Sequence, residues 1–129
     1  MPLDFSATSS RRHRGRRNYD AGRMAEESVA NAYEARGARV AERRWRGEGG
    51  EVDIVAELPD TLVFIEVKQS STFDRAAEAI TPRQVTRIRN AAAEYVGRYP
   101  TALSTPVRFD LALVNGRGEV QILENAFID

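Results

Sequence analysis

The chain has 129 residues, 42% of them hydrophobic and 29% charged, and a formal net charge of zero, values typical of one soluble globular domain with a modest core. The absence of cysteine excludes disulfides and thiolate metal sites, and the single histidine, His13, argues against histidine-based catalysis or zinc binding. No stretch approaches the run of about 20 apolar residues that crosses a bilayer, and no apolar secretory signal opens the sequence, so we expect a cytoplasmic protein outside membranes.

Positive charge is concentrated at the N-terminus. Residues 1–23 carry six arginines and two aspartates, a net charge of +4, whereas the remaining residues carry −4. Residues 1–18 show no periodicity, so we expect a flexible basic arm ahead of a single domain at residues 19–129. The arginine-rich stretch 11–17 is either a phosphate-binding arm or a solvated tail without that role.

A helix and a strand are predicted next. Asp20 is a suitable N-cap and Gly37 a suitable C-terminal stop, which predicts a helix over 21–36. Glu26 lies beside the apolar stripe of this helix, where it is either a charge at the rim or part of a site. Residues 38–46 predict a weaker strand that ends in the cluster Arg43-Arg44-Trp45-Arg46. The cluster either contacts phosphates and bases or ends an exposed strand, and the glycine-rich residues 47–50 predict a flexible loop.

The second half of the chain predicts a hairpin, a helix and another hairpin. Two β-rich runs flank a turn at Leu58-Pro59-Asp60-Thr61, which predicts a hairpin over 51–68. Residues 71–80 look irregular, and Thr81-Pro82 then opens a helix as cap and first residue. Strands are predicted at 107–115 and 119–125. The order α-β-β-β-α-β-β indicates an α/β or α+β fold.

The first hairpin gathers charges on one face. If its turn closes at Pro59-Asp60, Asp53 lies opposite Glu66 and Glu51 lies opposite Lys68. Alternation then places these four side chains together, and it leaves an apolar reverse face made of Val52, Ile54, Ile65 and Val67. A shift of one residue would destroy this separation, so the register is well specified.

Two facing carboxylates repel each other unless a positive charge lies between them. Mg²⁺ prefers oxygen ligands and is typically held by one or two carboxylates. Lys68, the only lysine beside 18 arginines, could stabilise charge on a phosphate or help to deprotonate a water molecule, because its ammonium is compact and its pKa shifts readily. The alternative is an exposed charged face on which Glu51 forms an ion pair with Lys68.

These residues match a known pattern. Asp53 followed by Glu66-Val67-Lys68 on a hairpin, after a helix that bears Glu26, resembles the PD-(D/E)XK nuclease superfamily. The segments AEESVANAYEARG, GGEVDIVA, LVFIEVKQ, RFDLALV and ENAF resemble the YraN-like family of small uncharacterised bacterial proteins, from about residue 20 to 127.

The resemblance implies a restriction endonuclease-like three-layer fold, in which helices flank a mixed central sheet. It also implies a Mg²⁺ or Mn²⁺ site made of Asp53, Glu66 and the Val67 carbonyl. Lys68 would be the catalytic lysine, and Glu26 and Glu51 would be further catalytic carboxylates. The chain departs from the family at Gln69, at Arg44, where asparagine is frequent, and at Arg83 or Arg87, where a lysine is frequent.

The leading hypothesis is therefore a Mg²⁺-dependent endonuclease that acts on DNA rather than RNA, including branched DNA as a candidate substrate. Its candidate phosphate contacts are Arg43, Arg44, Arg46, Arg83 and Arg87. A homodimer would suit a substrate with two strands to cut. The alternatives are a non-catalytic nucleic-acid binder with the same fold and an interaction module with a charged hairpin face.

Overall fold

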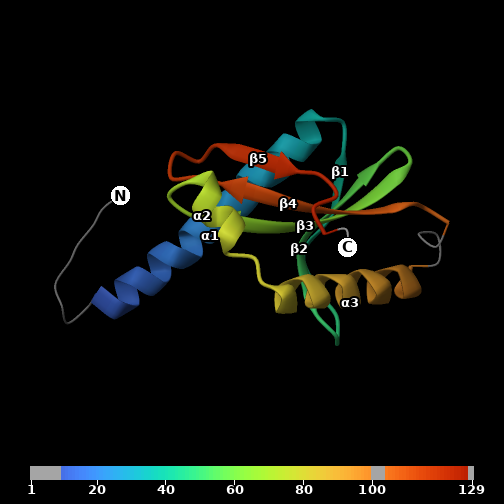
Figure 1. The fold of residues 1–129 in the computed structure, drawn as a ribbon, viewed down its shortest axis with the longest axis horizontal. Helices are drawn as coiled ribbons and strands as arrows, with labels where there is room; N and C mark the ends of the chain where they lie inside the picture. Colours follow the sequence, from blue (N-terminus) through green and yellow to red (C-terminus); the bar gives the residue numbers. More distant parts are fainter. Residues whose placement is uncertain (1–9, 100–103, 128–129) are drawn as a thin grey trace.

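The computed structural model describes residues 10–99 and 104–127. Its elements are, in order, α1 (Ser10–Ala35), β1 (Arg39–Arg46), β2 (Glu51–Leu58), β3 (Thr61–Gln69), α2 (Phe73–Glu78), α3 (Pro82–Arg98), β4 (Val107–Val114) and β5 (Val120–Leu123). The strands form one sheet in the order β1-β2-β3-β4-β5 (Figure 1). Neighbouring strands are antiparallel except β3 and β4, which are parallel and are joined by a crossover through α2 and α3.

Helices cover both faces of the sheet. On one face, α1 packs through a cluster that includes Ala25, Val29, Tyr33, Ile54, Val63 and Ile65. On the other face, α2 and α3 pack through a cluster that includes Val55, Phe64, Ala76, Ile88, Ala92, Tyr95 and Leu111. Each strand of the central hairpin therefore contributes alternate residues to two cores, which confirms the predicted α/β class with a mixed sheet between helices. No helix in the described ranges is long and apolar enough to cross a membrane.

Local sequence signals account for the best-predicted elements. α3 begins as expected, since the Thr81 hydroxyl accepts a hydrogen bond from the Gln84 N–H and the Gln84 side chain accepts one from the Thr81 N–H, with Pro82 in the first turn. The turn between β4 and β5 is closed by Asn115, whose side-chain oxygen accepts hydrogen bonds from the N–H groups of Arg117 and Glu119.

Two helix predictions are corrected. α1 begins at Ser10 rather than at residue 21, because arginine is a good helix former and the helix continues through the cap signal at Asp20. Residues 10–18 of the predicted arm are thus helical, and this part of α1 extends beyond the sheet (Figure 1). Residues 1–9 of that arm lie outside the described residues, and the division into an arm and one domain stays a prediction.

The second correction concerns the segment that looked irregular. It contains α2, which Thr72 caps by accepting a hydrogen bond from the Arg75 N–H at 3.1 Å. Ala76 of this short helix is fully buried against the sheet. The order of elements is therefore the predicted one with one additional helix in the crossover.

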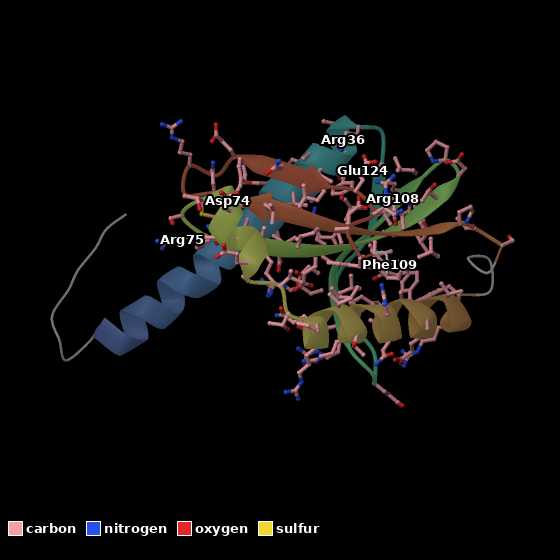
Figure 2. All side chains as sticks on the ribbon, in the orientation of Figure 1. Arg36, Asp74, Arg75, Arg108, Phe109 and Glu124 are labelled. Atoms are coloured by element: carbon pink, nitrogen blue, oxygen red, sulfur yellow. The ribbon has the colours of Figure 1, made fainter. Side chains whose placement is uncertain are left out.

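A buried polar network ties the distant parts of the chain together. Asp110 of β4 is fully buried and accepts hydrogen bonds from the Tyr33 hydroxyl of α1 (2.6 Å), the Arg108 guanidinium (2.9 Å) and the Asn125 N–H (3.0 Å). Burial and the Asp110 carboxylate raise the pKa of Tyr33 far above its usual value. Figure 2 shows the outer part of the network, formed by Arg36, Arg108 and Glu124.

Candidate functional site

The central hairpin has the predicted register. Its pairs run from Leu58 opposite Thr61 to Ile54 opposite Ile65. Beyond that point the Asp53 carboxylate, rather than a backbone carbonyl, accepts the hydrogen bond of the Val67 N–H, at 2.8 Å. The two strands are thus joined by a side chain where the charged residues begin.

Asp53 and Glu66 lie together, as expected, and interact directly. Burial, and then the charge of Glu66, raise the pKa of Asp53 to about 7, although the Val67 N–H works in the opposite direction. Burial also raises the pKa of Glu66, against the lowering effect of Lys68. A carboxyl pair that holds a proton near neutral pH would gain from a bound divalent cation, which removes the repulsion between the charges.

Lys68 completes this group. Its Nζ lies 3.2 Å from a Glu66 carboxylate oxygen, and the two side chains are only 18% and 12% exposed. The alternative in which Glu51 forms an ion pair with Lys68 is wrong, because Glu51 pairs with Arg46 at 2.8 Å. Lys68 therefore contacts the Asp53–Glu66 carboxyl pair and is not part of an exposed charged face of the sheet.

The backbone of β1 turns over beside this group. Arg44 has a left-handed φ of 53°, which is uncommon for a residue other than glycine. Arg43 and Arg44 consequently both reach α1, although successive strand residues normally face opposite sides. Arg43 pairs with Glu27 and Arg44 with Glu26, each at 2.8 Å.

The prediction that one face of the hairpin is entirely apolar is wrong. Val52 packs with Trp45 in the core beneath α3, whereas Ile54 and Ile65 pack beneath α1 and Val67 lies against that second core. The reversal lies beside Arg44, whose left-handed φ of 53° interrupts the alternation of faces along β1.

Two adjoining clefts open onto the acids. The first has a volume of about 170 Å³ and is lined by Glu26, Arg44, Arg46, Glu51, Val52 and Asp53. The second, about 60 Å³, is lined by Glu51, Glu66, Gln84, Arg87 and Ile88. Glu51 lines both clefts. Four of the five predicted catalytic residues therefore line the two clefts, and the fifth, Lys68, joins them through its contact with Glu66.

The predicted phosphate contacts divide into two groups. Arg43, Arg44 and Arg46 of β1 are exposed and each forms an ion pair with a carboxylate. Arg83 and Arg87 are exposed on α3, and neither forms an ion pair within the described part of the chain. Arg87 lines the second cleft together with Glu66.

Sequence reasoning missed Glu94 of α3, which fixes the loop between β1 and β2. Its carboxylate accepts hydrogen bonds from the Glu48 N–H (2.8 Å) and the Gly49 N–H (3.3 Å). Gly50 lies so close to α3 that a Cβ would stand 2.1 Å from the Arg87 carbonyl oxygen. The predicted flexible loop is therefore anchored, and the repeated glycines were the signal of this close approach.

The donor set suits a hard divalent cation. Asp53, Glu66 and the Val67 carbonyl offer oxygen ligands, which Mg²⁺ and Mn²⁺ prefer. Within residues 10–99 and 104–127, no group of three or more carboxylate, histidine or cysteine side chains is arranged to hold one ion. A site here would thus depend on two carboxylates and on oxygens from water or substrate, which is the usual composition of a Mg²⁺ site.

A larger cavity lies at the other end of the hairpin. It measures about 450 Å³ and is lined by residues that include Arg39, Glu42, Glu57, Tyr95 and Tyr99. Glu57 is neutralised there by Arg39, at 2.7 Å. None of the predicted catalytic residues lines this cavity, so its size does not make it the better candidate for chemistry.

Comparison with known proteins identifies the family. The model of the uncharacterised protein family UPF0102 matches residues 25–114, a range that contains Glu26, Glu51, Asp53, Glu66 and Lys68. UPF0102 protein SPO0400 of Ruegeria pomeroyi is 52% identical over 114 residues, which cover 88% of this chain and 93% of that protein. UPF0102 protein RD1_1191 of Roseobacter denitrificans is 48% identical over 119 residues, which cover 92% of each chain. The chain belongs to the UPF0102 family.

Proposed function

We propose that this protein is a nucleic-acid-binding protein that hydrolyses phosphodiester bonds in DNA with the help of Mg²⁺ or Mn²⁺. The observation that carries the proposal is the meeting of Asp53 and Glu66 at the clefts, with raised pKa values, and of Lys68 beside them, its ammonium 3.2 Å from Glu66. The resemblance to the PD-(D/E)XK nuclease superfamily supports the same assignment, and the sheet order is compatible with it.

Each residue has a task that its position supports. Asp53, Glu66 and the Val67 carbonyl would hold the cation, which supplies positive charge to polarise a phosphoryl oxygen when bound. Lys68 would orient the attacking water and stabilise the negative charge that develops on the phosphate. The Val67 N–H fixes the Asp53 carboxylate through its 2.8 Å hydrogen bond, so that this ligand is held in place beforehand.

Substrate contacts would come from both sides of the clefts. Arg87 and Arg83 on α3 are exposed, and Arg87 lines the second cleft. Arg44 and Arg46 of β1 line the first cleft, and Glu51 lines both. Contacts of this kind fix the position of a nucleic-acid backbone but do not read its sequence. Branched DNA remains a candidate substrate on the same grounds as duplex DNA.

The test is a cleavage panel with single-stranded, duplex, flap and four-way DNA and with RNA, in Mg²⁺ or Mn²⁺. We expect the wild-type protein to cut at least one DNA, and Asp53→Asn, Glu66→Gln and Lys68→Met to lose about 100-fold or more in rate while they still bind. Asp60→Asn, which changes an exposed turn carboxylate, is the matched control and should cut normally. Binding without any cutting would overturn the nuclease assignment and leave a non-catalytic nucleic-acid binder.

A further inference from the structure

Glu26 and Glu51, the two outer acids of the site, each form an ion pair with an arginine of β1. Arg44 Nε lies 2.8 Å from Glu26 Oε1, and an Arg46 guanidinium nitrogen lies 2.8 Å from Glu51 Oε1. Both acids line the same cleft as Asp53. The cleft thus contains three carboxylates, two of which are turned toward a cation of the protein itself.

The pairing of Arg44 with Glu26 depends on an unusual backbone. The φ of 53° at Arg44 sends this side chain toward α1 directly after Arg43, which already faces α1. The two pairs are alike in distance and lie on the same two elements. They differ in two respects. Glu26 lines the cleft that Asp53 lines and Glu27 does not, and the Glu26 side chain is 20% exposed whereas that of Glu27 is 59% exposed.

Both arginines can be reached from solvent. The side chains of Arg44 and Arg46 are 46% and 77% exposed, whereas those of Glu26 and Glu51 are 20% and 47% exposed. Ion pairs with an exposed arginine contribute little to stability, so a stronger partner can replace the carboxylate. A phosphate offers a guanidinium two parallel charge-assisted hydrogen bonds, which makes it a strong competitor for a carboxylate partner.

Resting on the proposed function, we propose that Arg44 is a positioning residue that holds Glu26 away from the cation until a nucleic-acid phosphate takes over its guanidinium. Arg46 holds Glu51 in the same way. Exchange of these partners releases one or two further carboxylates toward Asp53 and Glu66. Nucleic acid and divalent cation would then each increase the affinity of the protein for the other, since the coupling between two binding sites is reciprocal.

This arrangement accounts for the spacing of the acids. Within the described residues no three carboxylates surround one point, although four lie around the two clefts. Two of the four are turned toward arginines, and the remaining two are Asp53 and Glu66. A complete set of ligands would thus form only when a phosphate is bound. The free protein would then bind the cation weakly, and the cation would become fully coordinated only beside the substrate.

The experiment measures Mn²⁺ affinity by calorimetry on the full chain, with and without a duplex that carries hydrolysis-resistant phosphorothioate linkages. The main variant is Arg44→Asn, because asparagine tolerates a left-handed backbone better than alanine does. Arg43→Asn is the matched control, since it removes the same charge from the same strand but frees Glu27. Arg44→Lys retains a cation for Glu26 and should bind Mn²⁺ as the wild type does in the absence of DNA.

Without DNA, we expect Arg44→Asn to bind Mn²⁺ about two- to fivefold more tightly than the wild type, whereas Arg43→Asn is unchanged. DNA should tighten Mn²⁺ binding by the wild type and have less effect on Arg44→Asn. In a Glu26→Gln background the Arg44 substitution should have no effect. Equal Mn²⁺ affinities for Arg44→Asn and Arg43→Asn would overturn the proposal.

One further variant separates this proposal from the proposed function. Asp53→Asn should abolish Mn²⁺ binding whether or not Arg44 acts on Glu26. If Asp53→Asn binds Mn²⁺ as the wild type does, or if the wild type binds none, the metal site itself is wrong. If Asp53→Asn loses Mn²⁺ while Arg44→Asn binds it as the wild type does, the metal site stands and the role of Arg44 is wrong.

Discussion

At the scale of single residues, the unusual feature is a lysine in a chain that otherwise uses arginine for positive charge. Lys68 lies beside Glu66 with less than a fifth of its side chain exposed. An arginine is broader and stays protonated, so it could neither fit the same space with the same contacts nor change its charge during a reaction. The residue that is rare in composition is therefore located where its particular chemistry matters.

The raised pKa of Asp53 predicts how stability depends on pH. The pKa is about 7 in the folded protein, and it is about 4 in an unfolded chain, so the folded state binds the proton more tightly. The free energy of unfolding should then fall as the pH rises from about 4 to about 7. Asparagine cannot ionise, so Asp53→Asn should not lose stability as the pH rises, and its side-chain oxygen still accepts the Val67 N–H. The variant should therefore be more stable than the wild type by about 2 kcal/mol at pH 8.

Urea unfolding between about pH 3 and pH 8, in the absence of divalent cations, measures this effect. The two proteins should converge near about pH 3, where the wild-type carboxyl group is largely protonated in both states. Asp60→Asn, in the exposed turn, should follow the wild type throughout. A constant difference across the whole pH range would contradict the assigned pKa.

Residue patterns in the sequence were enough to predict that Asp53 and Glu66 lie together, but not to predict the left-handed backbone at Arg44. The register of the hairpin follows from the turn at Pro59-Asp60, which places Asp53, Glu66 and Lys68 close together. The left-handed φ of Arg44 could not be read in the same way, because arginine carries no preference for that conformation. An asparagine at this position would have been a signal, because asparagine favours this conformation.

At the scale of elements, the loop between β1 and β2 is held by α3. Gly50 packs against the Arg87 carbonyl, and Glu94 accepts the N–H groups of the loop. This contact fixes the start of β2, and with it Glu51 and Asp53. The helix that carries candidate phosphate contacts therefore also positions part of the candidate metal site.

Gly50→Ala tests that contact. The added Cβ would meet a backbone oxygen at 2.1 Å, so the loop or the helix must move, at a cost of about 1–3 kcal/mol in the free energy of unfolding. Gly97→Ala in α3 is the matched control, because nothing lies within 4 Å of its Cβ, and alanine should stabilise the helix by up to about 1 kcal/mol. Chemical denaturation of both variants checks the opposite signs, and equal effects would contradict this account of the loop.

Elements were predictable where the signal is local. The capping box of α3 and the turn residues between β4 and β5 lie within a few residues of the contacts they make. α2 was missed because its stability comes from packing of Ala76 on the sheet rather than from helical periodicity over several turns. The anchored loop was missed because its partner, Glu94, is distant in sequence.

At the scale of the whole molecule, Asp110 connects α1, β4 and the segment after β5. Its partners Tyr33, Arg108 and Asn125 come from three parts of the chain, so no local pattern predicts that this carboxylate is buried. The strand order of the sheet was unspecified for the same reason, since it depends on contacts between distant segments.

Removal of Asp110 should therefore be costly. Asp110→Ala leaves the Arg108 guanidinium and the Tyr33 hydroxyl without their acceptor and should lower the free energy of unfolding by about 3 kcal/mol. Tyr33→Phe removes one donor and should cost about 1.5 kcal/mol. Glu124→Gln, at the exposed rim of the network, should change stability by less than about 0.5 kcal/mol. Thermal and urea unfolding rank the three, and a loss for Glu124→Gln equal to that for Asp110→Ala would contradict this order.

The arrangement of the sheet also has a consequence for the order of folding. β2 and β3 meet across a turn of two residues, Pro59 and Asp60, whereas β3 and β4 pair only after α2 and α3 have been traversed. Closing the short loop costs far less chain entropy, so we expect the hairpin to form before the parallel pair. Asp53 and Glu66 would then meet while water still surrounds them. The repulsion between them would become costly only when β4 and α3 pack against the hairpin and bury the carboxyl pair.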